Sequence, residues 1–344
     1  MKSYGVAGAV RNVIPSLPSR CVQLQCRKRP VFDLEPLAQM PQATPTTSVS
    51  RNRVCVVTGA TRGIGRATAL SLAKLGAQVV LVGRDSARMD EVRRDADRTG
   101  TADVYSIRAD FASLTSVRRA ASEIANRWPA IHVLINNAGI NAGRRQVSAD
   151  GFELTFAVNH LAPFLLTTLL VPSLAAGAPS RIVNVTSVFA HLGEVEVKDI
   201  MFERRRYSST RAYNQSKLST AMFTIELADR LAGAGIAVNC VSPGLVATDL
   251  MREHWWFQPR WLRSLWSTWL LSPENAAERV VQVATSEALD GVSGKCFAAT
   301  LRPASLPRRA RDAAVRQALW NLSASLTNAE SVSPALRASE SREA

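Results

Sequence analysis

The feature that most constrains the fold is an alternation of short apolar runs with helical segments, which begins at Arg53. The apolar runs are rich in Val and Ile and show no polar alternation, which is typical of strands buried on both faces of a sheet. Strands separated by helices predict a parallel sheet. The expected strands are 54–57, 78–82, 104–107, 133–135, 181–185 and 236–240, and the expected helices are 64–75, 86–99, 114–127, 150–157, 161–174 and 211–232.

This pattern predicts an α/β protein with a single Rossmann-type, doubly wound parallel sheet that carries helices on both faces. No second set of strands follows, so we expect one folded domain over residues 51–320. Residues 1–50 are expected to be a leader or a flexible N-terminal segment. Residues 321–344, rich in Ser, Ala and Glu, are expected to be a flexible C-terminal tail.

The first 32 residues contain no acid and several arginines, which suits a mitochondrial presequence. A second interpretation is that Met40 is the true start, because a Pro/Thr/Ser-rich linker follows it at 41–50. Both remain open. A cytoplasmic location is favoured, and a mitochondrial one follows if residues 1–40 are a presequence.

The net charge of +14 lies mostly in the tails, because residues 1–53 contribute +6 and residues 301–344 contribute +3. The remaining +5 forms no basic stripe interleaved with aromatics, so we expect no nucleic-acid partner. The histidines are scattered and no CxxC spacing occurs, so we expect no metal site and reduced, structural cysteines. The longest apolar run, 161–178, contains two prolines and is interpreted as a buried helix.

A glycine-rich segment, TGATRGIG at 58–65, joins the first expected strand to the first helix. A dinucleotide pyrophosphate binds at this place in such folds, against the free N–H groups of the helix. A tight turn would use the same glycines. The strand before the segment and the helix after it favour cofactor binding.

Further motifs follow in a fixed order. They are Asp110, Asn136-Asn137-Ala138-Gly139, Asn159, Ser187, Tyr213-Asn214-Gln215-Ser216-Lys217 and Pro243-Gly244. With the TGxxxGxG spacing, they resemble the short-chain dehydrogenase/reductase family over roughly residues 53–300. The stretches NHLAPFLLT and AYNQSKLSTAMFTIELADRL resemble its retinol-dehydrogenase-like subgroup.

Tyr213 and Lys217 lie four residues apart on an expected helix, so both project from one face. A nearby ammonium favours the phenolate, which predicts a lowered pKa for Tyr213 and an acid/base role in hydride transfer. The family resemblance implies that Lys217 binds the nicotinamide ribose, that Ser187 holds the substrate oxygen, and that Asn159 supports a proton relay. It also implies an insertion near the site at 190–210.

Charge favours NADP(H) as the cofactor. Arg84 ends the second expected strand, where an acid would bind the ribose 2′-hydroxyl of NAD, and Arg62 can approach the same place. The acid Asp85, next to Arg84, would instead favour NAD(H). A single arginine at either position would more often be an ordinary solvated surface charge, so it is the pair that favours NADP(H). The residues expected to bind the cofactor are Gly59, Thr61, Arg62, Gly63, Ile64, Gly65, Arg84, Asp110, Phe111, Asn137, Ala138, Gly139, Tyr213, Lys217, Pro243, Gly244 and Thr248.

Five of the seven tryptophans fall within 255–269. The resemblance implies that residues 248–272 are a substrate lid, and the interspersed arginines suit a membrane interface as well as an apolar pocket. An oligomer contact or packing on the sheet would explain the same composition. The resemblance also implies a homodimer or homotetramer through 159–175 and 211–232.

These features predict an NADP(H)-dependent oxidoreductase that interconverts a lipophilic alcohol and its aldehyde or ketone, of retinoid, steroid or fatty type. Two alternatives stay open: a ketoreductase of specialised biosynthesis, and a non-catalytic NADP-sensing interaction protein. The tryptophan-rich lid disfavours the first. The presence of all four catalytic positions, Asn159, Ser187, Tyr213 and Lys217, speaks against the second.

Overall fold

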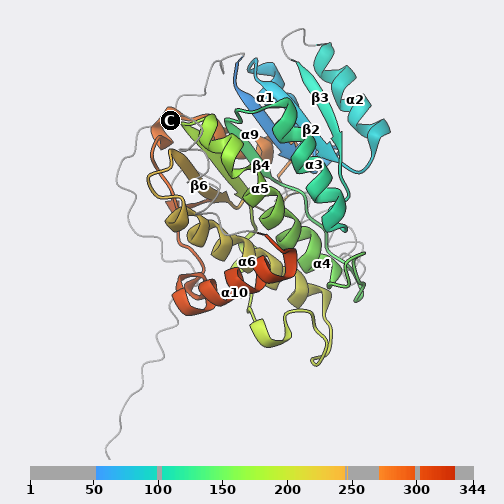
Figure 1. Cartoon of the computed structure of the whole chain (residues 1–344), viewed down its shortest axis with the longest axis vertical. Coiled ribbons are helices and arrows are strands. Elements are labelled where there is room, and N and C mark those ends of the chain that lie inside the picture. The colour runs from blue at the N-terminus through green and yellow to red at the C-terminus, as the bar shows by residue number, and fades with distance from the viewer. Residues whose placement is uncertain (1–51, 99–102, 245, 247–270, 299–302, 330–344) are drawn as a thin grey trace, which may run out of the picture. The chain divides into compact units, whose positions relative to one another are not determined.

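A computed structural model gives the arrangement of residues 52–98, 103–244, 246, 271–298 and 303–329 (Figure 1). The expected leader and nearly all of the expected lid, including Thr248 and the five clustered tryptophans, lie outside the described residues. Their predicted roles stay predictions.

The described residues are built around an eight-stranded sheet of order β3-β2-β1-β4-β5-β6-β7-β8. Neighbouring strands from β3 to β7 run parallel and β8 runs antiparallel to β7, which confirms the predicted Rossmann-type sheet. The two-residue strands β7 and β8 were not predicted because they are too short to show a pattern. The strands are β1 Val54–Thr58, β2 Gln78–Gly83, β3 Val104–Arg108, β4 Val133–Asn136, β5 Ser180–Val185, β6 Ile236–Val241, β7 Cys296–Phe297 and β8 Pro303–Ala304.

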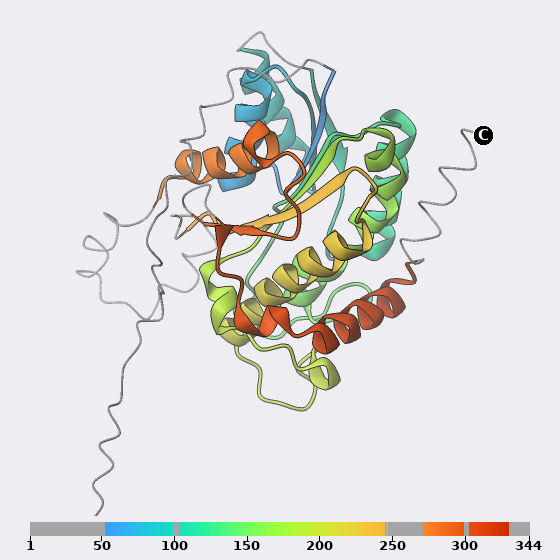
Figure 2. The ribbon, with the colours of Figure 1, turned by 90° about the vertical axis from the view of Figure 1, so that its left-hand side faces the viewer.

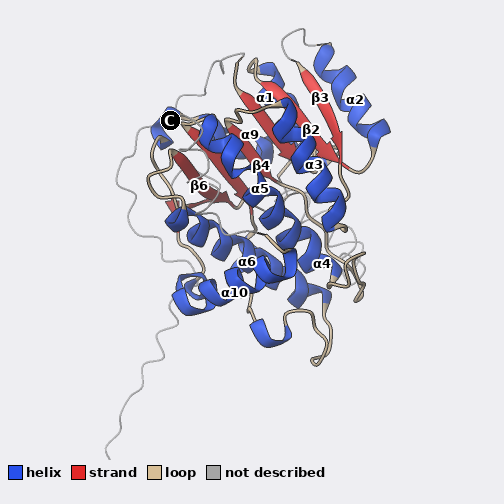
Figure 3. Cartoon of the chain, viewed as in Figure 1, coloured by secondary structure: helices blue, strands red, loops and turns tan. Residues whose placement is uncertain are grey.

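Helices cover both faces of this sheet, as Figures 2 and 3 show. One face packs against α1 (Gly63–Lys74), α2 (Ser86–Asp97) and α9 (Pro273–Thr285). The other packs against α3 (Leu114–Arg127), α5 (Ala162–Ala176) and α6 (Ser209–Arg230). Helix α9 was not predicted, although Ser272 caps it and Pro273 opens it, which is a recognisable start signal.

The order of the strands fixes where a ligand can bind. The chain leaves β1 toward β2 and β3 and later returns on the other side of β1 to form β4. Adjacent crossovers therefore diverge between β1 and β4, and a crevice opens at the carboxyl ends of these strands. Thr58 ends β1 and Asn136 ends β4, so the sequence motifs that follow both strands face this crevice.

The long apolar helix runs from 154 to 176 without a break. It consists of α4 (Leu154–Phe156), a π turn η1 (Ala157–Leu161) and α5, where two separate helices were predicted. By length and composition it could cross a membrane, but 89% of its most apolar window is buried inside the protein. This confirms the interpretation of a buried helix.

Helix α10 (Ala313–Thr327) corrects the predicted end of the folded domain, because it continues past residue 320. Its buried residues Leu319, Trp320, Ser323 and Thr327 recur at helical spacing. The helical pattern was not recognised in the sequence because two of these buried positions are Ser and Thr, in a segment rich in Ser and Ala. Residues 330–344 of the expected tail lie outside the described residues.

Figures 1 and 2 show α10 lying along α6. The Trp320 ring lies 4.9 Å from the Phe164 ring and 6.1 Å from the Phe223 ring, and Arg316 forms an ion pair with Glu226. Part of the outer surface of α5 and α6 is therefore covered within the chain. The expected pairing of subunits through these helices stays a prediction, and it would have to include α10.

The remaining helical turns are short. The π turn aside, they are η2 (Val188–Leu192), η3 (Val197–Asp199), η5 (Glu287–Leu289) and η6 (Arg308–Arg311). Cys55, Cys240 and Cys296 are free and buried in strands, as predicted, whereas Cys21 and Cys26 lie outside the described residues.

Candidate active site

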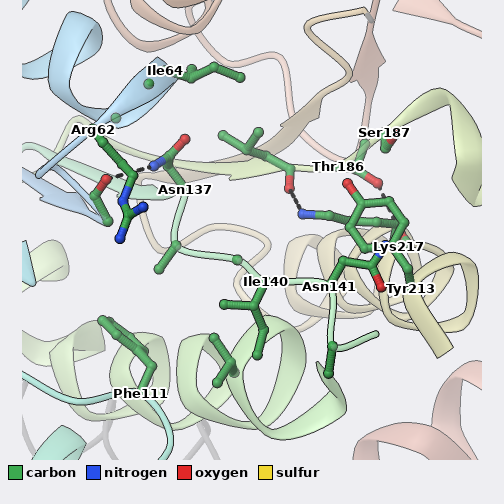
Figure 4. Close-up of a pocket in the computed structure, with 18 of the residues that line it drawn as sticks. Arg62, Ile64, Phe111, Asn137, Ile140, Asn141, Thr186, Ser187, Tyr213 and Lys217 are labelled. Carbon is green, nitrogen blue, oxygen red and sulfur yellow. Dashed lines mark hydrogen bonds between the residues drawn. The ribbon is translucent and has the colours of Figure 1, made fainter. Parts of the chain in front are cut away.

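A cavity of about 990 Å³ lies at the carboxyl ends of the central strands. Figure 4 shows Arg62 toward one end, Tyr213, Ser187 and Lys217 toward the other, and Asn137 and Ile140 between them. The predicted residues that line it are Gly59, Thr61, Arg62, Gly63, Ile64, Gly65, Arg84, Asp110, Phe111, Asn137, Ala138, Gly139, Ser187, Tyr213, Lys217, Pro243 and Gly244.

The glycine loop requires its glycines for two physical reasons. Gly59 and Gly63 have φ values of +66° and +53°, in the left-handed region that side chains disfavour. A Cβ on Gly65 would lie 2.3 Å from the carbonyl oxygen of Gly59, so no side chain fits there. Helix α1 then begins without a side-chain cap, which suits an anionic group at its N-terminus.

Thr58 joins the two strands that flank the cavity. Its hydroxyl accepts hydrogen bonds from the backbone N–H groups of Asn137 and Ala138, each at 3.0 Å, and donates to the carbonyl of Ile135 at 3.2 Å. Asn137 Nδ2 donates to the carbonyl of Thr58 at 2.9 Å. Sequence reasoning missed Thr58 as a site residue, although it directly precedes the first glycine of the loop.

Two arginines mark one end of the cavity. Arg62 and Arg84 are exposed and line its wall. The neighbouring Asp85 caps α2, where its carboxylate accepts from the backbone N–H of Arg88 at 3.2 Å and pairs with the Arg88 side chain at 3.3 Å. Asp85 does not line the cavity. The acid that would have favoured NAD(H) therefore caps helix α2 and does not face the cofactor site.

Tyr213 and Lys217 project from one face of α6 into the cavity, as predicted. Burial raises the pKa of Tyr213 to about 12, and a hydrogen bond with Ser187 opposes part of that rise. The Lys217 ammonium lies 5.7 Å from the centre of the Tyr213 ring and donates to the carbonyl of Val185 at 3.0 Å. Burial lowers the pKa of Lys217 to about 8.

These values correct the prediction that Lys217 lowers the pKa of Tyr213. Removal of the phenol from water disfavours the phenolate, and this effect outweighs the hydrogen bond from Ser187. Spacing along a helix predicted the pair correctly, but it contains no information about burial.

Asn159 lies behind the cavity wall and does not line it. It is buried on the π turn, where its Oδ1 accepts from the backbone N–H of Ile140 at 2.8 Å and its Nδ2 donates to Ile140 and Ser216, each at 2.9 Å. A Cβ on Gly139 would lie 3.4 Å from Asn159 Oδ1 and 3.5 Å from Lys217 Nζ. Asn159 therefore fixes the loop at Gly139 and Ile140, which separates Asn159 from the cavity. Asn159 and Lys217 both lie near Gly139.

Sequence reasoning did not name many residues of the cavity wall. They include Ile140, Asn141, Ala142, Gly143, Gln146, Leu154, Val158, Phe189, Thr210 and Asn214. These residues come from the segment between β4 and α4, from α4 and the π turn, from η2 and from the start of α6. No regular spacing links them, so only the fold brings them together.

The predicted insertion, 190–210, is hydrogen-bonded to the segment that follows β4. The Tyr207 hydroxyl lies 3.0 Å from the carbonyl of Ala142, to which it donates, and 3.3 Å from Glu153. Glu153 is fully buried and accepts from the backbone N–H groups of Thr155 and Phe156 at the start of α4. The insertion is thus held beside the cavity, as the sequence predicted.

Comparisons with known proteins agree with this arrangement. A family model described as short chain dehydrogenase matches residues 53–257. Retinol dehydrogenase 13 of Homo sapiens is 38% identical over 85% of this chain and 89% of its own length. An uncharacterised protein from Mycobacterium paratuberculosis has a crystal structure with a TM-score of 0.66 and 33% identity, covering 81% of this chain and 94% of that one. A Beutenbergia cavernae protein described as an NAD(P)-dependent gluconate 5-dehydrogenase, with NADP bound, has a TM-score of 0.61 and 29% identity, covering 75% of this chain and 98% of that one.

Two glycines of the cavity wall give a matched test of the loop. Gly65→Ala is expected to abolish measurable binding of a nicotinamide dinucleotide, because its Cβ would meet the Gly59 backbone at 2.3 Å. Gly143→Ala is the control, since a Cβ there meets nothing within 4 Å. Fluorescence titration with NADPH measures both. Unchanged affinity in Gly65→Ala would show that the loop is not the binding site.

Proposed function

The chain belongs to the short-chain dehydrogenase family and is an oxidoreductase acting on CH–OH groups, and on that premise we propose that it uses NADP(H) to interconvert a lipophilic alcohol and its aldehyde or ketone. The observation that carries the proposal is one continuous cavity. The glycine loop and Arg62 line it at one end, and Tyr213, Ser187 and Lys217 line it at the other. Arg84 also lines it.

The proposed cofactor seat follows the length of this cavity. The uncapped start of α1 would face the pyrophosphate, and Arg62 and Arg84 would pair with a 2′-phosphate. Lys217 would bind the nicotinamide ribose. A bound nicotinamide supplies or accepts the hydride. The residues present fit such a group because helix α1 starts without a side-chain cap and two exposed arginines line the same cavity.

Tyr213 is the proposed proton donor. Its raised pKa, about 12, keeps the proton on the phenol throughout the neutral range, which is the form needed to protonate a carbonyl oxygen. Ser187, hydrogen-bonded to Tyr213, would hold the same oxygen. Oxidation of the alcohol would use the same groups in reverse.

Apolar side chains on the cavity wall support an apolar substrate. They include Ile140, Leu154, Val158 and Phe189, and a 37–38% identical group of relatives carries the name retinol dehydrogenase. Asn141 and Gln146 on the same wall favour the second candidate, a ketoreductase of a more polar carbonyl. A panel of retinal, long-chain aldehydes, steroid ketones and small polar ketones, followed by NADPH absorbance, separates the two.

Replacement of Tyr213 tests the proton donor directly. Tyr213→Phe is expected to lower the reductive kcat by roughly a hundred- to ten-thousandfold, because the general acid is lost. Binding of NADPH should change little. Tyr105→Phe is the matched control, since Tyr105 lies on β3 and does not line the cavity. Equal activity of the two variants would remove Tyr213 from the mechanism.

Cofactor preference is tested at the two arginines. Arg62→Ala and Arg84→Ala are each expected to weaken NADPH binding about ten- to a hundredfold while NADH binding changes little, because only NADPH carries the 2′-phosphate. Arg88→Ala is the control, because Arg88 is exposed near the same strand end but does not line the cavity. Equal losses for both cofactors would contradict the proposed phosphate site.

Lys217 gives the reaction an expected pH dependence. Its pKa of about 8 means that the ammonium is present below pH 8 and is lost as the pH rises through that value. The reductive kcat/KM, which reports the free enzyme, should therefore be level near neutrality and fall above about pH 8. A pH profile that stays level to pH 10 would show that the charge on Lys217 is not needed.

A further inference from the structure

A second, much smaller cavity lies behind the wall of the first. Its volume is about 10 Å³, and its walls include Asn136, Asn159, His160 and Asn184. Ala138 and Val185 line both cavities, so a single layer of residues separates them. A volume of this size corresponds to one water molecule.

His160 contributes a hydrogen-bond acceptor to this region. Ser323 donates its only hydroxyl proton to the carbonyl of Leu319 at 2.7 Å, so it can only accept from His160 Nε2, which lies 2.8 Å away. The Nε2 atom of His160 therefore carries the ring proton and Nδ1 is bare. Burial lowers the pKa of His160 to about 3, which keeps the ring neutral. Within the described residues, Nδ1 has no hydrogen-bond partner.

Asn136 contributes a second acceptor, and its orientation follows from its neighbours. Thr224 donates to the carbonyl of Thr220 at 2.9 Å, so it accepts from Asn184 Nδ2 at 3.0 Å. Asn184 Oδ1 must then accept, and Asn136 Nδ2 donates to it at 2.9 Å. The other N–H of Asn136 Nδ2 donates to Thr167 at 2.9 Å.

Asn136 Oδ1 is left without a hydrogen-bond partner in the described part of the chain. Asn136 is 6% exposed and His160 is 2% exposed, so bulk water does not solvate either group. A buried acceptor without a donor destabilises the folded state, because it has lost its hydrogen bonds to water and gained none in return. The same region therefore contains two acceptors that need a donor, and a space large enough for one small molecule.

We propose that one ordered water molecule occupies this small cavity and donates its two protons to Asn136 Oδ1 and His160 Nδ1. Asn184 lies on the same wall, and the second N–H of its Nδ2 would donate to the water oxygen. Buried waters make about three such hydrogen bonds.

The position of the water gives it a structural task. It joins the end of β4, the end of β5 and the π turn that carries Asn159. Val185, which accepts from Lys217, and Ala138, on the loop after β4, lie on its walls. The water would thus connect three segments that position the candidate active site.

A crystal structure of the full chain, at a resolution that shows ordered water, tests the proposal. The expected result is one water within hydrogen-bonding distance of both Asn136 Oδ1 and His160 Nδ1. An empty cavity overturns it, and so does a His160 ring or an Asn136 amide turned so that these atoms meet protein donors. The ¹⁵N shifts of His160 give a second test, because a proton on Nδ1 in place of Nε2 would also overturn it.

A pair of variants tests the same site in solution. Oxygen-17 relaxation dispersion counts long-lived buried waters. His160→Phe removes the acceptor and should lower the count by one, whereas Ser323→Ala removes only the other partner of His160 and should leave it unchanged. An equal count in His160→Phe and the wild type would overturn the proposal. If His160→Phe does not fold, the wild-type crystal structure and the ¹⁵N shifts still decide the question.

Discussion

The threonine hydroxyl at the end of β1 holds together the two strands on which the rest of the site depends. Thr58 accepts two hydrogen bonds from the loop after β4 and donates one to the carbonyl of Ile135 in β4 itself. Strands β1 and β4 pair directly, and the Thr58 contact extends this pairing past the strand ends, where the crossovers diverge. The cofactor loop and the Asn137 loop therefore lie against each other and line one cavity together.

The sequence predicted the strands well where they are buried on both faces, since a continuous apolar run has few other interpretations. It failed where the signal was short or mixed. The pair β7 and β8 has two residues in each strand, and α10 buries Ser323 and Thr327 on its inner face. The cofactor-binding and catalytic residues were predictable because they follow strand ends or share a helix face at fixed spacing. The wall residues Ile140, Gln146 and Phe189 were not, because they stand in short or irregular segments without any period.

The pKa of Tyr213 shows a second limit of sequence reasoning. Four-residue spacing places an ammonium near a phenol, and a charge alone would lower the pKa of that phenol. Burial disfavours the charged form of each group, which opposes the effect of their mutual attraction. It raises the pKa of Tyr213 to about 12 and lowers that of Lys217 to about 8. The balance between charge and desolvation depends on the residues that close over the pair, and these come from distant parts of the chain.

The same desolvation explains why polar side chains accumulate behind the site. Asn136, Asn184 and Thr224 lie in the interior, and each donated proton there fixes the orientation of the next group. A buried polar group left without a partner would lower the free energy of unfolding by about 1–3 kcal/mol, so one arrangement of these hydrogen bonds is strongly favoured over the others. Asn159 on the adjoining π turn is held in the same way by Ile140 and Ser216. This buried network therefore holds the strand ends and the π turn beside the site, and an acceptor that finds no donor among the described residues can be satisfied by a buried water.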